Sequence, residues 1–140
     1  MPANIYKLVK LKKISLWFGY LLVVFLVYVC LTPDPPDTPS VAFGDKIAHF
    51  SSYALLFLWF AQIYQRPFQT KVAIYLVLLG IGIEVAQGFT AYRVFEYADM
   101  LANSVGVIIG WVIAATPAAS MLVFVERRFA KSVSVLSSEK

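Results

Sequence analysis

Four long apolar runs constrain this chain more than any other feature of its sequence. They cover Ile14–Leu31, Ile47–Tyr64, Val72–Phe89 and a longer stretch from Met100 to about Val125. A helix needs about 20 residues to cross the hydrocarbon of a bilayer, and lengths of roughly 17–25 are usable. The first three runs sit at the short end of that range, so flanking Tyr and Lys side chains are expected to reach the headgroups. The pattern predicts an all-α membrane protein, built as a four-transmembrane-helix bundle.

The composition excludes an ordinary soluble domain. Only 14% of the 140 residues are charged, against about 25% in soluble globular domains. The net charge of +4 does not indicate nucleic-acid binding, because the basic residues lie between and outside the apolar runs and form no continuous stripe. We therefore expect one membrane domain and no nucleic-acid partner.

The distribution of basic residues predicts the orientation. Ten of the twelve Lys and Arg residues fall in segments 1–13, 65–71 and 126–140. The two remaining connections hold only Lys46 and Arg93, against five acidic residues. Because cytoplasmic loops carry the excess of Lys and Arg, both termini are predicted to be cytoplasmic. Residues 1–13 form the basic N-terminus, 14–125 the membrane domain, and 126–140 a Ser-rich tail that we expect to be disordered.

The connections carry their own signals. Thr32–Gly44 contains four prolines and is predicted to be extended. Gln65–Lys71 is predicted to be a tight turn with a proline, and Thr90–Asp99 a charged and aromatic loop. Pro117 either bends the fourth helix or ends it just before that residue. We favour a bent helix that continues to Val125, because the residues after the proline stay apolar.

With this topology, the unusual polar residues gather at the outer ends of the helices. Positions three and four apart share one face of a helix, so each of the last three helices presents a polar face at this end. The candidate ligand-binding residues are Asp45, Lys46, His49, Tyr53, Glu84, Gln87, Arg93, Asp99 and Asn103.

Glu84 is the most informative member of this set. It lies five residues inside Phe89, or about 7.5 Å below the end of the helix at 1.5 Å per residue. Ionisable residues at such depth usually face the bundle interior and have a partner. Arg93, His49 and Lys46 are the nearest candidates for that partner. A buried ion pair that holds the helices in register and a functional site are both compatible with this position.

The residues leave open whether any reaction is catalysed. Glu84 and His49 are the candidate general bases. Ser51 and Ser52 lie too close to His49 on the same helix to be aimed at it as nucleophiles. One histidine among carboxylates is a poor zinc site, because zinc usually takes several His or Cys ligands. We expect neither a metal nor a cofactor.

Three sequence blocks, in order, carry a resemblance to a known family. Residues 45–53 (DKIAHFSSY) resemble the "DK-x-x-H-F-x-x-Y" signature of VanZ-like membrane proteins. Residues 82–87 (GIEVAQ) resemble the family's "G-x-x-E-x-x-Q", with one residue instead of two between Gly82 and Glu84. The family's ending, "R…D-x-x-x-N-x-x-G-x-x-x-G", is matched by Arg93, Asp99, Asn103, Gly106 and Gly110. This chain departs from the pattern at 94–98, where Glu96 stands in place of an acidic residue closer to the arginine.

The resemblance implies a multi-pass protein of the bacterial cytoplasmic membrane that acts at the cell envelope. The family takes its name from a protein linked to teicoplanin resistance, and its biochemical activity is not established. Our leading hypothesis is a binding protein for an envelope lipid headgroup or a lipid-linked cell-wall precursor. An enzyme that modifies such a lipid, a small proton-coupled exporter and a purely structural subunit remain as alternatives. The oligomeric state is left open.

Overall fold

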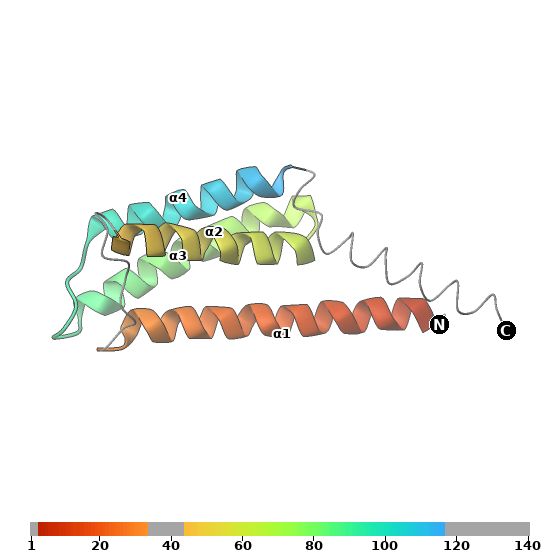
Figure 1. Ribbon diagram of the computed structural model, residues 1–140, viewed down its shortest axis with the longest axis horizontal. Coiled ribbons are helices and arrows are strands. Elements are labelled where there is room, and N and C mark those ends of the chain that lie inside the picture. The colour runs from red at the N-terminus through yellow and green to blue at the C-terminus, as the bar shows by residue number, and fades with distance from the viewer. Residues whose placement is uncertain (1–2, 34–43, 117–140) are drawn as a thin grey trace.

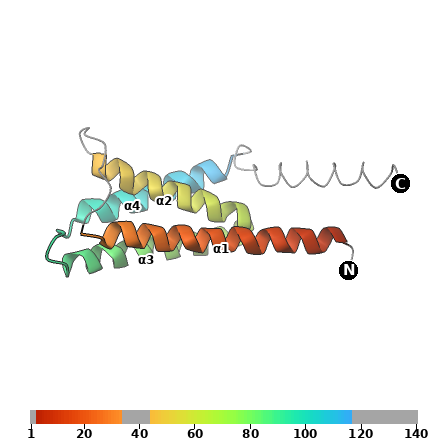
Figure 2. The same ribbon diagram turned by 60° about the horizontal axis from the view of Figure 1, so that its bottom comes forward.

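The computed structural model describes residues 3–33 and 44–116, with side chains from residue 11 onward. These ranges contain four helices and no strand: α1 (Ala3–Leu31), α2 (Gly44–Ile63), α3 (Arg66–Gly88) and α4 (Tyr97–Ala114). The helices run up and down in turn, and α1 lies along one side of the other three (Figure 1). The same arrangement is visible after rotation (Figure 2). The all-α prediction is confirmed.

The connection between α2 and α3 is shorter than predicted. Segment 65–71 was expected to be a turn, but α3 already begins at Arg66 and has Pro67 in its first turn. Proline suits this position, because its fixed φ matches the helix and the first turn needs no backbone donor there. The expectation of a tight turn as far as Lys71 is therefore wrong, and α2 and α3 form a close helical hairpin.

The ends of α4 also differ from the prediction. The helix begins at Tyr97, so Asp99 lies in its first turn and not in the preceding loop. It ends at Ala114, before Pro117, and the predicted continuation to Val125 lies outside the described residues. A proline disfavours helical conformation in the residue before it, so the chain leaves the helix ahead of that position. The predicted tail, and most of the proline-rich segment after α1, lie outside the described residues.

The closest packing in the bundle is between α2 and α4. Two glycines of α4 make it possible. A Cβ placed on Gly106 would collide with the backbone carbonyl of Phe50, and one on Gly110 would lie 2.7 Å from the carbonyl oxygen of Ala54. Small residues at such positions let helix backbones approach each other. The glycine pair is thus a packing motif.

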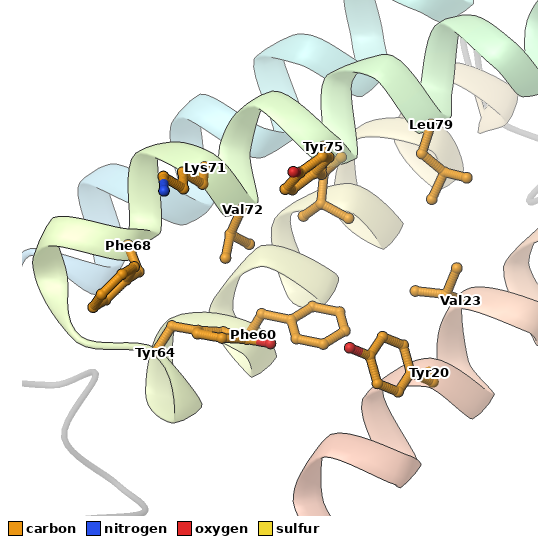
Figure 3. A pocket seen from close by; sticks show the side chains of 10 residues that line it. Tyr20, Val23, Phe60, Tyr64, Phe68, Lys71, Val72, Tyr75 and Leu79 are labelled. Carbon is orange, nitrogen blue, oxygen red and sulfur yellow. The ribbon is translucent and has the colours of Figure 1, made fainter.

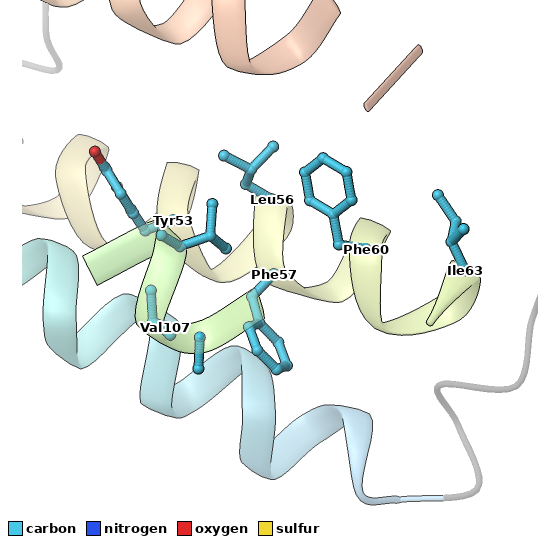
Figure 4. Close-up of a cluster of buried hydrophobic side chains, with 8 residues drawn as sticks. Tyr53, Leu56, Phe57, Phe60, Ile63 and Val107 are labelled. Carbon is cyan, nitrogen blue, oxygen red and sulfur yellow. The ribbon is translucent and has the colours of Figure 1, made fainter. Parts of the chain in front are cut away.

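The apolar core lies in the middle of the bundle and at the end away from the polar residues. It consists mainly of α2 side chains, with contributions from α3 and α4 (Figure 4). Tyr53 sits at one edge of this cluster and Ile63 at the other, with Phe57 between them fully buried. Residues of α1 pack on it only in part. The core therefore holds α2 inside the bundle and leaves α1 as the most loosely attached helix.

Three of the four helices are long and apolar enough to cross a membrane: α1 from Leu11 to Leu31, α3 and α4. The fourth helix, α2, begins with a charged turn and does not meet this criterion of length and hydropathy. Many large apolar side chains on the outer faces of α1, α3 and α4 are exposed. In water this would be unfavourable, whereas in a bilayer these faces meet lipid tails. The chain is an all-helical membrane protein.

Candidate functional site

The structure brings the predicted polar residues together at one end of the bundle. This end is formed by the start of α2, the ends of α1 and α3, the loop 89–96 and the start of α4 (Figure 1). We call these residues, together with Glu96, the polar cluster. Its members are Asp45, Lys46, His49, Tyr53, Glu84, Gln87, Arg93, Glu96, Asp99 and Asn103.

Lys46 is surrounded by three carboxylates. Its Nζ lies 2.7 Å from Asp45 Oδ2, 2.7 Å from Glu96 Oε2 and 2.5 Å from Asp99 Oδ1. Burial lowers the pKa of Lys46, but the hydrogen bonds to the three acids more than offset this and raise it overall. The hydrogen bond from Lys46 in turn lowers the pKa of Asp45. The ammonium is therefore permanently charged and already neutralised.

This arrangement changes the role expected for Lys46. We expected it to meet a ligand phosphate, but an ammonium that contacts three acids has little attraction left for another anion. The carboxylates of Asp45, Glu96 and Asp99 lie within 4.8 Å of one another. Oxygen ligands of this kind suit hard divalent cations, yet here the Lys46 ammonium takes the central position. The three acids share this one ammonium.

His49 joins α2 to α4. Its Nδ1 is 3.1 Å from Asn103 Oδ1. Because an amide oxygen can only accept, the Nδ1–H donates. The other ring nitrogen, Nε2, lies 3.6 Å from Asp99 Oδ2. Asn103 is only 2% exposed, so the imidazole supplies a partner to a buried amide. Both ring nitrogens face the protein, which leaves neither aimed at a ligand.

Glu84 is buried to 99% and makes one hydrogen bond. Its Oε1 accepts the backbone N–H of Glu96 at 2.6 Å, so α3 holds the residue that precedes α4. The sequence suggested Arg93, His49 or Lys46 as its partner. None of the three forms an ion pair with it among the described residues, and that expectation is wrong. The second oxygen, Oε2, is buried without a hydrogen-bond partner in the same part of the chain.

Gln87 and Tyr92 attach the end of α1 to this cluster. Gln87 Nε2 donates to the carbonyl oxygen of Cys30 at 2.8 Å, and the Tyr92 hydroxyl donates to that of Leu31 at 2.8 Å. The last carbonyls of a helix have no partner within the helix, so both side chains act as caps. Gln87 was expected to contact a ligand. Tyr92 was not predicted at all, and only its place in a loop between two helices hinted at a role.

Two further members of the cluster have a buried side-chain atom without a hydrogen-bond partner in the described ranges. Tyr53 is 1% exposed, and its hydroxyl makes no hydrogen bond in the described ranges. A Cβ on Gly80 would lie 3.2 Å from both this hydroxyl and the Asn103 amide, so a glycine makes room for the pair. Arg93 Nε is likewise buried without a hydrogen-bond partner among the described residues. Its guanidinium forms no ion pair with any of them.

The neighbouring serines are not arranged as nucleophiles. The Ser51 and Ser52 hydroxyls both donate to backbone carbonyls one turn earlier in α2. This agrees with the expectation that neither is aimed at His49. The described cluster leaves one Glu oxygen, one Tyr hydroxyl and one Arg nitrogen buried without a hydrogen-bond partner.

Comparison with known proteins finds a distant relative of this chain. It is 27% identical over 110 residues to an uncharacterized protein of Schizosaccharomyces pombe. The alignment spans 76% of this chain and 64% of the yeast protein, so about a third of that relative has no counterpart here. No solved structure matches.

The family assignment is much firmer. The sequence model of the VanZ/LLP1 family matches residues 2–123, which include all four helices. The three blocks that resemble VanZ-like proteins all lie inside this match and supply most of the polar cluster. The chain therefore belongs to the VanZ/LLP1 family.

Proposed function

We propose that this chain is a membrane-embedded binding protein whose polar cluster takes up the polar headgroup of a lipid. One observation carries the proposal: Tyr53 Oη, Glu84 Oε2 and Arg93 Nε are all buried at the same end without a hydrogen-bond partner among the described residues. Buried polar groups are normally paired, and each unpaired one costs about 1–3 kcal/mol. A ligand that supplies the missing partners recovers this cost.

The free atoms define the chemistry of that ligand. Arg93 offers donors that suit a phosphate or carboxylate, while Glu84 Oε2 accepts a hydrogen bond from a hydroxyl or an ammonium group. Tyr53 completes the set with a hydroxyl that can donate or accept. A headgroup that carries both an anionic phosphate and a hydroxyl or amino donor matches all three. Lys46 is not part of this recognition, because its charge is already balanced.

Two ligand classes share this chemistry: a phospholipid headgroup and a lipid-linked cell-wall precursor. The yeast relative favours the phospholipid, because the yeast envelope contains no peptidoglycan. A cell-wall precursor would in turn connect the chain to glycopeptide resistance, as the family's name suggests. We place the phospholipid first and treat altered teicoplanin sensitivity in a bacterial host as the readout of the second class.

An enzyme that modifies such a lipid is less well supported. A general base needs a nitrogen or oxygen within reach of the substrate proton, and both ring nitrogens of His49 already face Asn103 and Asp99. Only Glu84 keeps a free oxygen. No hydroxyl nucleophile stands ready beside a base, since Ser51 and Ser52 bond to their own helix. Binding needs only hydrogen-bond partners, and the unpaired atoms of Tyr53, Glu84 and Arg93 can supply these.

The topology that we propose has four membrane crossings. α2 has 20 residues and is therefore about 30 Å long, which equals the thickness of the hydrocarbon layer. It lies in the middle of three helices that are themselves long enough to span, with the charged turn at one end (Figures 1 and 2). With the positive-inside rule, both termini are cytoplasmic and the polar cluster faces outward. The host membrane is then the cytoplasmic membrane of a bacterium.

Native mass spectrometry on the purified chain tests the binding proposal. Wild-type protein should retain phosphate-containing lipid, and Arg93→Gln should weaken the binding of one lipid molecule at least tenfold, which corresponds to about 1.4 kcal/mol. Ser104→Ala is the matched control, because this hydroxyl only donates to the Met100 carbonyl of its own helix. Equal retention by Arg93→Gln and wild type would contradict the proposal.

A further inference from the structure

A separate cavity lies at the opposite end of the bundle from the polar cluster. It measures about 420 Å³ and opens between α1, α2 and α3 (Figure 3). Tyr20 of α1 and Phe60 and Tyr64 of α2 form one wall, and Phe68, Lys71 and Leu79 of α3 form another. We call this cavity the apolar groove. Its volume lies within the range of about 300–1,000 Å³ that small-molecule sites occupy.

The groove follows from the loose attachment of α1. At Gly19 the α1 backbone packs against Phe60 and Trp59 of α2, but elsewhere the residues of α1 only partly cover the core. Along α3 the lining runs from Lys71 to Leu79, a distance of about 12 Å at 1.5 Å per residue. The groove therefore extends from the end of the bundle toward its middle, parallel to the helices. In a membrane, its open side faces lipid tails.

Lys71 is the one charged residue in the lining. Its Nζ lies 5.9 Å from the centre of the Phe68 ring, and no carboxylate pairs with it among the described residues. Two other polar side chains at this end are already occupied. Arg66 donates to the carbonyl of Ala115, and Gln69 donates to that of Ala61. Lys71 is therefore the charged group that the lining offers to an anionic ligand.

The shape and charge together select the occupant. An extended peptide would bury backbone polar groups against side chains that offer them almost no partners. A hydrocarbon chain makes no such demand, and a lysine at the interface extends its ammonium toward an anionic headgroup.

We propose that the apolar groove holds one acyl chain of an anionic phospholipid whose phosphate contacts Lys71. The site is distinct from the polar cluster and lies in the opposite leaflet. It is also independent of the headgroup binding proposed above, since it shares no residue with that cluster. The lipid fills the gap between α1 and the other helices and fixes the position of α1.

Fluorescence quenching by lipids brominated in their acyl chains tests this proposal. A tryptophan is introduced in the groove by Tyr20→Trp, in a background with Trp17→Phe, Trp59→Phe and Trp111→Phe. The protein is reconstituted into brominated phosphatidylglycerol or brominated phosphatidylcholine. The adjacent, exposed Leu21→Trp probe is the control, because it lies at nearly the same depth but outside the lining.

The groove probe should prefer the anionic lipid about fivefold, the amount that one lysine near a headgroup contributes. Lys71→Gln should abolish this preference, whereas Lys13→Gln, an exposed lysine of α1, should preserve it. The Leu21→Trp probe should show no preference. Equal quenching of Tyr20→Trp by both lipids, or equal effects of the two lysine changes, would overturn the proposal. Circular dichroism of each variant shows whether it has kept its helical structure. If a tryptophan variant has not, native mass spectrometry compares phosphatidylglycerol binding by the wild type and by Lys71→Gln without other changes. Weaker binding by Lys71→Gln would support the proposal, and equal binding would overturn it.

Glu84→Gln separates this proposal from the first one. It lies in the polar cluster, so it should leave the lipid preference of the groove probe unchanged. If the groove fails its test while Glu84→Gln still weakens headgroup binding, only the second site is refuted. If the groove preference is present while headgroup binding is not, only the first is refuted.

Discussion

Replacing Glu84 by Gln tests whether the buried carboxylate binds a ligand or only supports the fold. The new side chain keeps an oxygen that can accept the Glu96 N–H, so the hydrogen bond of 2.6 Å is retained in neutral form. Hydrogen bonds to charged groups contribute about 1.5–3 kcal/mol and neutral ones about 0.5–1.5. The loss of charge assistance is therefore about 1 kcal/mol.

An opposing effect reduces that loss. A buried charge without a full set of partners is costly, and Glu84→Gln removes it. We therefore expect the variant to unfold within roughly 4 °C of wild type, since about 1 kcal/mol shifts the midpoint by a few degrees in a chain of this size. Glu84→Ala should cost more, about 2–4 kcal/mol, because it removes the acceptor of the Glu96 N–H and leaves a cavity.

For Glu84→Gln, lipid binding should be impaired much more than folding. The Gln side chain presents an amide nitrogen or a weaker acceptor where Oε2 stood, so retained headgroup lipid should fall at least tenfold while the protein accumulates normally. Thermal unfolding in detergent and native mass spectrometry measure the two quantities on one preparation.

A double variant sharpens the result. The structure shows no ion pair between Glu84 and Arg93, so Arg93→Gln should not restore stability to Glu84→Gln. Rescue by the second change would show that the two charges form a structural pair. Wild-type lipid retention by a folded Glu84→Gln variant would show that the carboxylate is no part of the site.

Three further predictions follow from the packing and the topology. Gly106→Ala should destabilise the bundle by about 1–3 kcal/mol, because its Cβ would collide with the α2 backbone. In the control Gly82→Ala the new Cβ meets nothing within 4 Å, so this change should be neutral or slightly stabilising. Equal unfolding midpoints of the two variants would contradict the assigned helix contact. His49→Phe should cost about 1–3 kcal/mol by leaving the buried amide of α4 without its donor, which chemical denaturation measures against a His49→Gln variant that can still donate. Alkaline phosphatase should be active when fused between α1 and α2 and inactive when fused between α2 and α3, and the reverse pattern would invert the proposed orientation.

Hydrophobic periodicity was sufficient to locate the helices but not their ends. The apolar runs lie largely within the four observed helices as far as Ala114, since burial and lipid exposure both require apolar residues. Arg66, by contrast, opens α3 although it precedes the apolar run by six positions, because Pro67 favours a helix start in any environment. The end of α4 depends on a proline, whose effect on a membrane helix can be a bend or a stop.

The polar cluster could be predicted as a set of residues but not as a set of contacts. Helical spacing places Asp45 and His49 on one face, and opposite charges suggest ion pairs. Sequence reasoning considered only side chains as partners for Glu84, whereas the observed partner is a backbone N–H that exists because α4 starts just after Glu96. Likewise, Lys46 contacts acids from two helices and a loop. These contacts depend on the tertiary structure, so the local sequence pattern could not predict them.

The distribution of polar groups along the bundle bears on the remaining alternative, a proton-coupled exporter. A substrate or proton that crosses the membrane needs polar groups or water along its whole path. Below Tyr53 the centre of the bundle is filled by apolar side chains such as Phe57, Leu76 and Val107, each at most 5% exposed. The next buried polar side chain is Gln69, whose amide is occupied by helix-end carbonyls. The described bundle therefore has a polar end and an apolar groove with no polar path between them, an arrangement that favours holding lipid over moving cargo.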